Sequence, residues 1–206
     1  MLSRRRKTVN KKSVKLLFIL AVILMLYYVI VRAFPMLIVT EAKYGAYFYP
    51  RAMWLFPHIV LGIIAILVGP LQFIEKFRNN NLSLHRKLGK FYVFSVILSG
   101  FFGMYLAITS KVNLTYTVGL FFLGVTWTTT AVMAWISIKK MKIEVHKEWM
   151  IRSYVITFSF VTFRLFVDAI HAADKVEYFD VLALMAWASW AVPLFIAELF
   201  IQGRKL

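Results

Sequence analysis

Four histidines, which are all the histidines of this 206-residue chain, stand near the ends of long apolar segments. They are His58, His85, His146 and His171. Neutral imidazole is a ligand for zinc, copper and haem iron, and it titrates close to physiological pH. An ionisable side chain at a membrane boundary costs free energy, so a paired arrangement of histidines there predicts a functional site.

The segments that must position these histidines predict an all-α, polytopic membrane protein. Of the residues, 61% are hydrophobic and the mean hydropathy is +0.74, whereas a soluble domain is about 45–50% apolar. Six spans have the length and apolar character of transmembrane helices, at about 14–33, 55–74, 90–109, 117–138, 149–170 and 181–201. We therefore expect one six-helix transmembrane domain over 16–206, after a basic segment at 1–15.

Charge sets the expected orientation of the spans. The chain has 25 Lys and Arg against 9 Asp and Glu, a net charge of +16. With the N-terminus inside, 19 bases lie on the inner side and four in outer loops, which predicts cytoplasmic termini in the plasma (inner) membrane. His85 and His146 then face the cytoplasm, and His58 and His171 the outside. We expect the basic N-terminal segment to contact anionic lipids, and no motif accompanies it that would indicate nucleic-acid binding.

Stripes of small and polar residues at helical spacing mark the second to fifth spans. The second span, for example, carries His58, Gly62, Ala65, Gly69 and Gln72. Small residues allow helices to approach closely in lipid, so these spans are expected to form a four-helix core over about 55–172. Close packing could account for the stripes alone, or they could face a polar cavity or a flat cofactor.

On the fifth span, Arg164, Asp168 and His171 are spaced i, i+4 and i+7, which places them above one another on one helix. Arg164 is roughly two turns inside the outer end, too deep for a casual surface charge. Either Arg164 and Asp168 neutralise each other as an ion pair, or they form an outer site together with His58 and His171. His58, Asp168 and His171 are also candidate metal ligands.

The inner histidines open similar segments, HRKLGKFYVFSV (85–96) and HKEWMIRSYVIT (146–157). Gly89, one turn beyond His85, would leave room for a cofactor edge or a neighbouring helix. Arg152 and Tyr154 could support the same inner site. The alternative is that both histidines only contact lipid headgroups beside the neighbouring bases.

These segments, together with GPLQF (69–73), resemble a bacterial family of predicted membrane proteins of unknown function. The shared patterns are His-Arg-x-x-Gly-x-x-Tyr, His-x-x-Trp-Met-x-Arg-x-Tyr and a later Arg in the same helix, and the match covers about 55–172. The resemblance implies a bacterial plasma-membrane protein. The chain is more loosely similar to transmembrane di-haem b-type cytochromes, which would imply an inner haem between His85 and His146 and an outer one between His58 and His171.

Several functions remain open. Electron transfer through haem b is one hypothesis; the others are a proton-coupled transporter that uses Arg164 and Asp168, a His/Asp metal-dependent membrane enzyme, and a subunit or chaperone of a larger complex. The chain has no cysteine, which excludes disulfides, thiolate nucleophiles, iron–sulfur ligation and c-type haem attachment. A small-molecule ligand and a second copy of the chain are both candidate partners.

Overall fold

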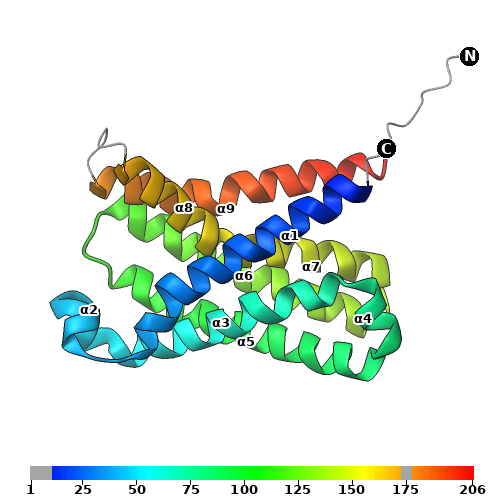
Figure 1. Cartoon of the computed structure of the whole chain (residues 1–206), viewed down its shortest axis with the longest axis horizontal. Coiled ribbons are helices and arrows are strands. Elements are labelled where there is room, and N and C mark those ends of the chain that lie inside the picture. The colour runs from blue at the N-terminus through cyan, green and yellow to red at the C-terminus, as the bar shows by residue number, and fades with distance from the viewer. Residues whose placement is uncertain (1–10, 173–177) are drawn as a thin grey trace, which may run out of the picture.

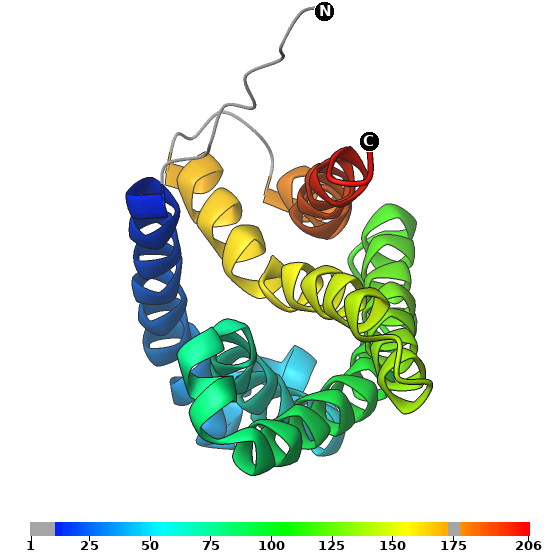
Figure 2. The ribbon, with the colours of Figure 1, turned by 90° about the vertical axis from the view of Figure 1, so that its right-hand side faces the viewer.

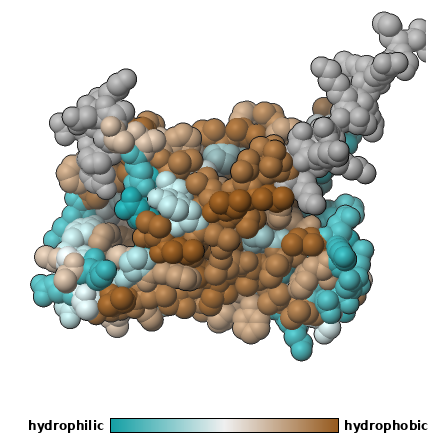
Figure 3. Space-filling view, viewed as in Figure 1, coloured by the Kyte–Doolittle hydropathy of each residue, from teal (hydrophilic) through white to brown (hydrophobic). Residues whose placement is uncertain are grey.

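The structure is a computed structural model that describes residues 11–172 and 178–206. Within these ranges the chain is helical and contains no strand. Six helical stretches are long and apolar enough to cross a membrane, which confirms the predicted six-span, all-α architecture. The helices run along the long axis of the molecule (Figure 1), and apolar residues form a belt between two polar ends (Figure 3).

The spans are built from one or more helices each. The first comprises α1 (Lys11–Tyr28), a π-helical stretch η1 (Val29–Ala33) and a 3₁₀ turn η2 (Phe34–Leu37). The second follows α2 (Glu41–Phe48) and η3 (Tyr49–Arg51) and consists of α3 (Ala52–Phe73). After the short α4 (Glu75–Asn80) come α5 (Leu82–Ile108), α6 (Leu114–Lys139), α7 (Ile143–Thr157), α8 (Ser159–Ala172) and α9 (Tyr178–Gly203).

The predicted four-helix core is formed by α3, α5, α6 and α7, each of which packs against the next along the chain. Close approach depends on small residues, since a Cβ at Gly69 of α3 would overlap the ring of Tyr154 on α7. A Cβ at Gly124 of α6 would lie 2.6 Å from Cγ of Met104 on α5. Small residues at these two positions therefore serve helix packing, as expected in lipid.

The fifth span, expected at about 149–170, is confirmed over Ile143–Ile170, but it consists of two helices. A turn at Phe158 separates α7 from α8. Immediately before this turn, the Thr157 hydroxyl donates to the carbonyl of Ser153 at 2.9 Å, a type of bond that bends helices. Beyond the break, α8 packs against α9 and α1 instead of the core helices (Figure 2). The outer half of this span thus leaves the four-helix core.

The aromatic segment between the first two spans closes the end of the molecule opposite α4 (Figure 1). Gly45 has a φ of 63°, which lets the chain reverse direction inside α2. The guanidinium of Arg51 lies 3.7 Å from the centre of the Tyr47 ring and donates to the carbonyl of Thr109 at 3.0 Å. These contacts fasten α2 to the end of α5.

Candidate functional site

A cavity of about 550 Å³ lies between α8 and the halves of α3, α5 and α6 that are remote from α4. It exists because α8 turns away from the core helices at Phe158. Most of its wall is apolar, and four glycines line it: Gly62, Gly100, Gly103 and Gly124. An apolar cavity with a few convergent polar groups is the usual form of a small-molecule site. We call it the outer cavity.

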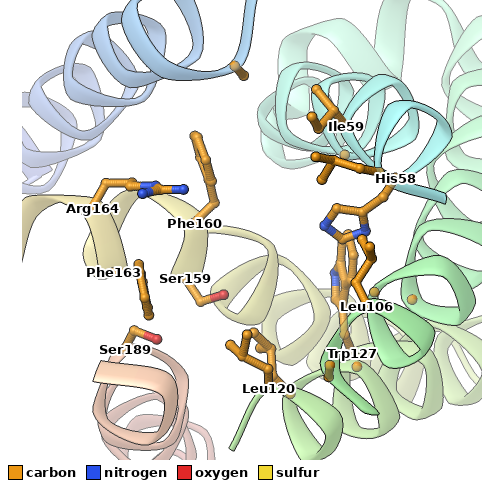
Figure 4. A pocket seen from close by; sticks show the side chains of 18 of the residues that line it. His58, Ile59, Leu106, Leu120, Trp127, Ser159, Phe160, Phe163, Arg164 and Ser189 are labelled. Carbon is orange, nitrogen blue, oxygen red and sulfur yellow. The ribbon is translucent and has the colours of Figure 1, made fainter. Parts of the chain in front are cut away.

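His58 enters the outer cavity from α3 (Figure 4). Its Nδ1 lies 2.8 Å from the main-chain carbonyl of Ser99 on α5 and 3.1 Å from the Ser99 hydroxyl. A carbonyl only accepts, so Nδ1 carries the proton and donates to it. The Ser99 hydroxyl in turn donates to the carbonyl of His58 at 2.9 Å. In the neutral ring, Nε2 therefore keeps a free lone pair, available to a ligand or a metal.

Arg164 extends from α8 toward the same cavity from the opposite wall (Figure 4). Its guanidinium carbon lies 5.7 Å from the centre of the Phe163 ring. Among residues 11–172 and 178–206, no carboxylate or hydrogen-bond acceptor engages this guanidinium. A cation at this depth without a counter-ion is costly, which favours an anionic group in the cavity.

Two serines lie on the α8–α9 wall near Arg164. Ser189 of α9 is 1% exposed, and its hydroxyl has no hydrogen-bond partner within the described part of the chain. Ser159 of α8 is 5% exposed and its hydroxyl also lines the cavity (Figure 4). Because unpaired buried hydroxyls are uncommon, Ser189 marks a point where a ligand atom can be hydrogen-bonded.

A buried polar network forms the floor of the outer cavity. The Tyr92 hydroxyl lies 2.9 Å from the hydroxyls of both Ser153 and Thr157, and Tyr92 is 0% exposed. Trp127 donates its indole N–H to the Thr157 hydroxyl at 2.8 Å. Every member of this network has a partner, so it fixes the relative positions of α5, α6 and α7 directly below the cavity.

The carboxylate of Asp168 is held by Arg32 and not by Arg164, so the self-neutralising pair, one of the two alternatives for the fifth span, is not the arrangement in the structure. The two carboxylate oxygens of Asp168 each lie 2.8 Å from Nη2 of Arg32 on η1. Helical spacing could not reveal this, because Arg32 is 136 residues away in the chain. The spacing placed Arg164 and Asp168 on one helix face, but the first span supplies the closer cation.

The proposed outer cluster is therefore only partly assembled. His58 and Arg164 share the outer cavity, whereas the carboxylate of Asp168 is held by Arg32. The side chain of His171 lies outside the described residues. Among the side chains that are described, no three His, Asp or Glu residues gather as metal ligands.

The inner histidines lie at the other end of the core. Nδ1 of His146 is 2.9 Å from the main-chain carbonyl of Ala134 on α6, so it donates there and leaves Nε2 free. His85 is close enough to His146 for their charges to interact, and its Nδ1 is buried without a partner in the described structure. Nε2 of Gln72 is likewise unpaired, and the side chain of Gln72 lies against Gly89. The two inner histidines therefore lie at the same end of the core and interact electrostatically.

Arg152 and Tyr154, the other residues expected at the inner site, are engaged elsewhere. Nε of Arg152 lies 2.8 Å from a carboxylate oxygen of Glu198 on α9, and Nη1 lies 3.7 Å from Glu148. The Tyr154 hydroxyl donates to the carbonyl of Ile66 at 3.3 Å. Both side chains therefore tie α7 to its neighbours.

A fold of six helices that are long and apolar enough to span a membrane, around a cavity lined by His58 and Arg164, defines a polytopic membrane protein. A family model described as "Predicted membrane protein (DUF2306)" matches residues 55–201. The chain belongs to this family, whose function is unknown, and the matched region includes the core helices, α8 and most of α9. Neither a curated protein nor a solved structure matches the chain.

Several residues of the cavity were not singled out from the sequence as site residues. Ser159, Ser189 and Trp127 line it, and each stands in an apolar segment where a polar or aromatic residue is common. Ser189 comes from α9, the span that showed no stripe. The feature that marks Ser189 is a buried hydroxyl without a hydrogen-bond partner in the described structure, and only the three-dimensional packing reveals it.

Proposed function

We propose that the protein binds haem b in the outer cavity, with His58 as an axial ligand, and takes part in electron transfer within the membrane. The observation that carries the proposal is the orientation of His58. Its Nδ1–H is held by the Ser99 carbonyl, and its Nε2 lone pair is presented to an apolar cavity. Metal-ligating histidines almost always donate their second ring N–H to such a partner, which fixes both tautomer and ring orientation.

The rest of the cavity suits the chemistry of haem b. The apolar wall would exclude water from the macrocycle. Arg164 offers a guanidinium that has no counter-ion among the described residues and can bind a propionate through paired hydrogen bonds. Bound haem would supply one-electron chemistry at its iron. The protein's own part is to ligate, orient and desolvate the group.

The inner histidines are a weaker place for haem. His146 has the same arrangement as His58, because its Nδ1–H is held by a carbonyl of the neighbouring helix. However, the core next to it is filled by buried side chains, among them Tyr92 and Met150. We therefore assign one haem to the outer cavity. We assign no haem to His85 and His146, and we give them a structural role at the opposite end of the core.

The test is an absorption spectrum of detergent-purified protein from haem-sufficient cells, oxidised and dithionite-reduced, with haem quantified per chain. We expect one haem, a Soret band that sharpens on reduction, and loss of that band in His58→Ala. His146→Ala is the matched control, because it removes a histidine with the same second-ring bond at the other end of the core. A colourless wild-type protein after hemin titration, or equal loss in both variants, would contradict the proposal.

A second candidate function is the binding or carriage of another amphipathic anion. The guanidinium of Arg164, which has no ion-pair partner in the described part of the chain, lies beside apolar walls and favours this function. The transporter hypothesis based on Arg164 and Asp168 together is less well supported, because the carboxylate of Asp168 is bound to Arg32. A protein that binds fatty carboxylates but no hemin would favour this second function.

We also propose the inner-membrane orientation, with the N- and C-terminal ends in the cytoplasm. The start of α1 and the end of α9 lie at the same end of the molecule as α4 (Figure 1). Bases of the described helices concentrate at that end, including Lys76, Arg78, Arg86, Lys87 and Lys90. The outer cavity would then open toward the opposite side of the membrane. Reporter fusions at the C-terminus and in the loop before α6 would test the orientation.

A further inference from the structure

We propose that Asp168 has two alternative arginine partners, and that Arg32 controls the anion site by keeping Asp168 away from Arg164. When Arg32 holds Asp168, Arg164 is free to bind the anionic group of a ligand in the outer cavity. When the first span separates from α8, Asp168 pairs with Arg164 and competes with that ligand. Arg32 is thus a positioning residue for a site that it does not line.

The first state is the one in the structure. Nη2 of Arg32 lies 2.8 Å from both carboxylate oxygens of Asp168, and these bonds join η1 to α8. The side chains of Arg32 and Asp168 are 46% and 37% exposed, so the pair stands at the surface and not in the core. Both residues belong to membrane-spanning segments, Leu16–Leu37 and Ile143–Ile170, and lie near the ends of these segments, where a separated arginine can reach the headgroups.

The second state follows from the geometry of α8. Arg164 and Asp168 are four residues apart on one helix, a spacing that puts their Cβ atoms about 5–6 Å apart. Both side chains are long enough to meet across one turn. An acid placed four residues after a base is the less favourable order for an ion pair on a helix. This agrees with the structure, in which Asp168 pairs with Arg32 instead of Arg164.

The contacts of the first span make the exchange possible. Below the ion pair, the first span is held by an apolar cluster of Met25, Tyr28, Val29, Ile66 and Val161. Arg32 itself belongs to the π-helical stretch η1, a conformation found mostly as short segments at functional sites. Val29 and Ala33 of η1 line the outer cavity, as do Phe160 and Phe163 of α8. The ion pair therefore closes the seam between η1 and α8 beside the cavity.

This arrangement also provides a route from the bilayer. A ligand with an apolar body and a carboxylate would reach the cavity through the seam when Arg32 and Asp168 part. When Arg32 and Asp168 pair again, Arg164 would be released from Asp168. Its guanidinium would then be available to the carboxylate of the ligand that has entered. The ligand half of this inference depends on the proposed function, whereas the exchange of partners does not.

The exchange is tested without ligand by a cycle of variants in lipid nanodiscs, using the thermal midpoint of unfolding. Arg32→Gln and Arg164→Gln should each lower the midpoint only slightly, because Asp168 retains one arginine. The double variant should lose more than the sum of the two, and adding Asp168→Asn should restore most of that loss. If the double variant does not fold, recovery of folding on addition of Asp168→Asn supports the inference. Additive losses, or no recovery with Asp168→Asn, would overturn it.

The control of the anion site is tested with iron-free protoporphyrin IX, whose fluorescence reports binding and whose carboxylates do not need His58. Arg32→Gln should weaken the binding of protoporphyrin IX about tenfold, which corresponds to the loss of one charge-assisted hydrogen bond. Addition of Asp168→Asn to this variant should restore the binding. The dimethyl ester, which has no carboxylates, should bind all variants alike. Unchanged binding in Arg32→Gln, equal weakening of the ester, or no porphyrin binding to the wild type would refute this control. Hemin binding that depends on His58 is a separate result and decides the proposed function.

Discussion

The contact between Gly69 and Tyr154 predicts a large effect of a single methyl group. In Gly69→Ala the new Cβ would overlap Cε2 and Cδ2 of the Tyr154 ring, and it would lie 3.2 Å from Cζ. The ring cannot move alone, because its hydroxyl is bonded to the Ile66 carbonyl and its edge packs against Phe73 at 5.5 Å between centroids. The helices α3 and α7 must separate, or Tyr154 must leave its bond.

The magnitude follows from the two terms involved. Overpacking of a dense interior costs typically 1–3 kcal/mol, and loss of the hydrogen bond to Ile66 adds about 1 kcal/mol. Replacement of a helical glycine by alanine returns about 1 kcal/mol through helix propensity. Gly69→Ala should therefore lower the free energy of unfolding by about 1–3 kcal/mol.

Gly62→Ala on the same helix is the matched control. Its Cβ would lie 3.8 Å from the Ser99 hydroxyl, which is an ordinary van der Waals contact. This variant therefore gains the higher helix propensity of alanine without a steric overlap. The assay is thermal or denaturant unfolding in detergent, in which Gly62→Ala should equal or exceed the wild type. A Gly69→Ala protein as stable as Gly62→Ala would refute the reasoning. Partial recovery on adding Tyr154→Leu would confirm the ring as the cause.

Three further predictions concern the core, the cavity and the inner ion pairs. Tyr92→Phe should lower the free energy of unfolding by about 1–2 kcal/mol, since it removes bonds to two buried hydroxyls; denaturant unfolding would measure this, and no change would contradict the network. Ser189→Ala should leave unfolding within about 0.5 kcal/mol, because its hydroxyl has no partner in the described structure, yet weaken porphyrin binding severalfold in a fluorescence titration. Glu198→Gln should destabilise the protein by about 1–2 kcal/mol in thermal unfolding, because it removes the carboxylate that pairs with the largely buried Arg152. Glu144→Gln is the control, and it should change stability by less than about 0.5 kcal/mol because its ion pair with Lys147 is exposed.

The fold was largely predictable from the sequence because each span is set by local composition. The second span was expected at 55–74 and α3 runs over Ala52–Phe73, since length and hydropathy determine where a helix crosses the bilayer. The glycine stripes correctly indicated which spans form the core. The break at Phe158 was missed, because no proline or glycine marks it and both halves are apolar.

The candidate site was predictable only in part. His58 and Arg164 were named from their depth in the membrane, and the structure brings both to one cavity. Periodicity compares residues within one helix, so it suggested Asp168 as the partner of Arg164 and could not find Arg32. Ser189 was missed for the same reason, because its significance lies in contacts between α8 and α9.

The turn at Phe158 separates two differently packed parts of the fifth span. On one side of it, α7 packs against α6 and α9; on the other, α8 packs against α9 and α1. A change in bilayer thickness or lateral pressure that tilts the outer helices would be absorbed at this turn. It would alter the separation of Arg164 and His58 while leaving the histidines at the other end undisturbed, so the physical state of the surrounding lipid would tune the outer cavity.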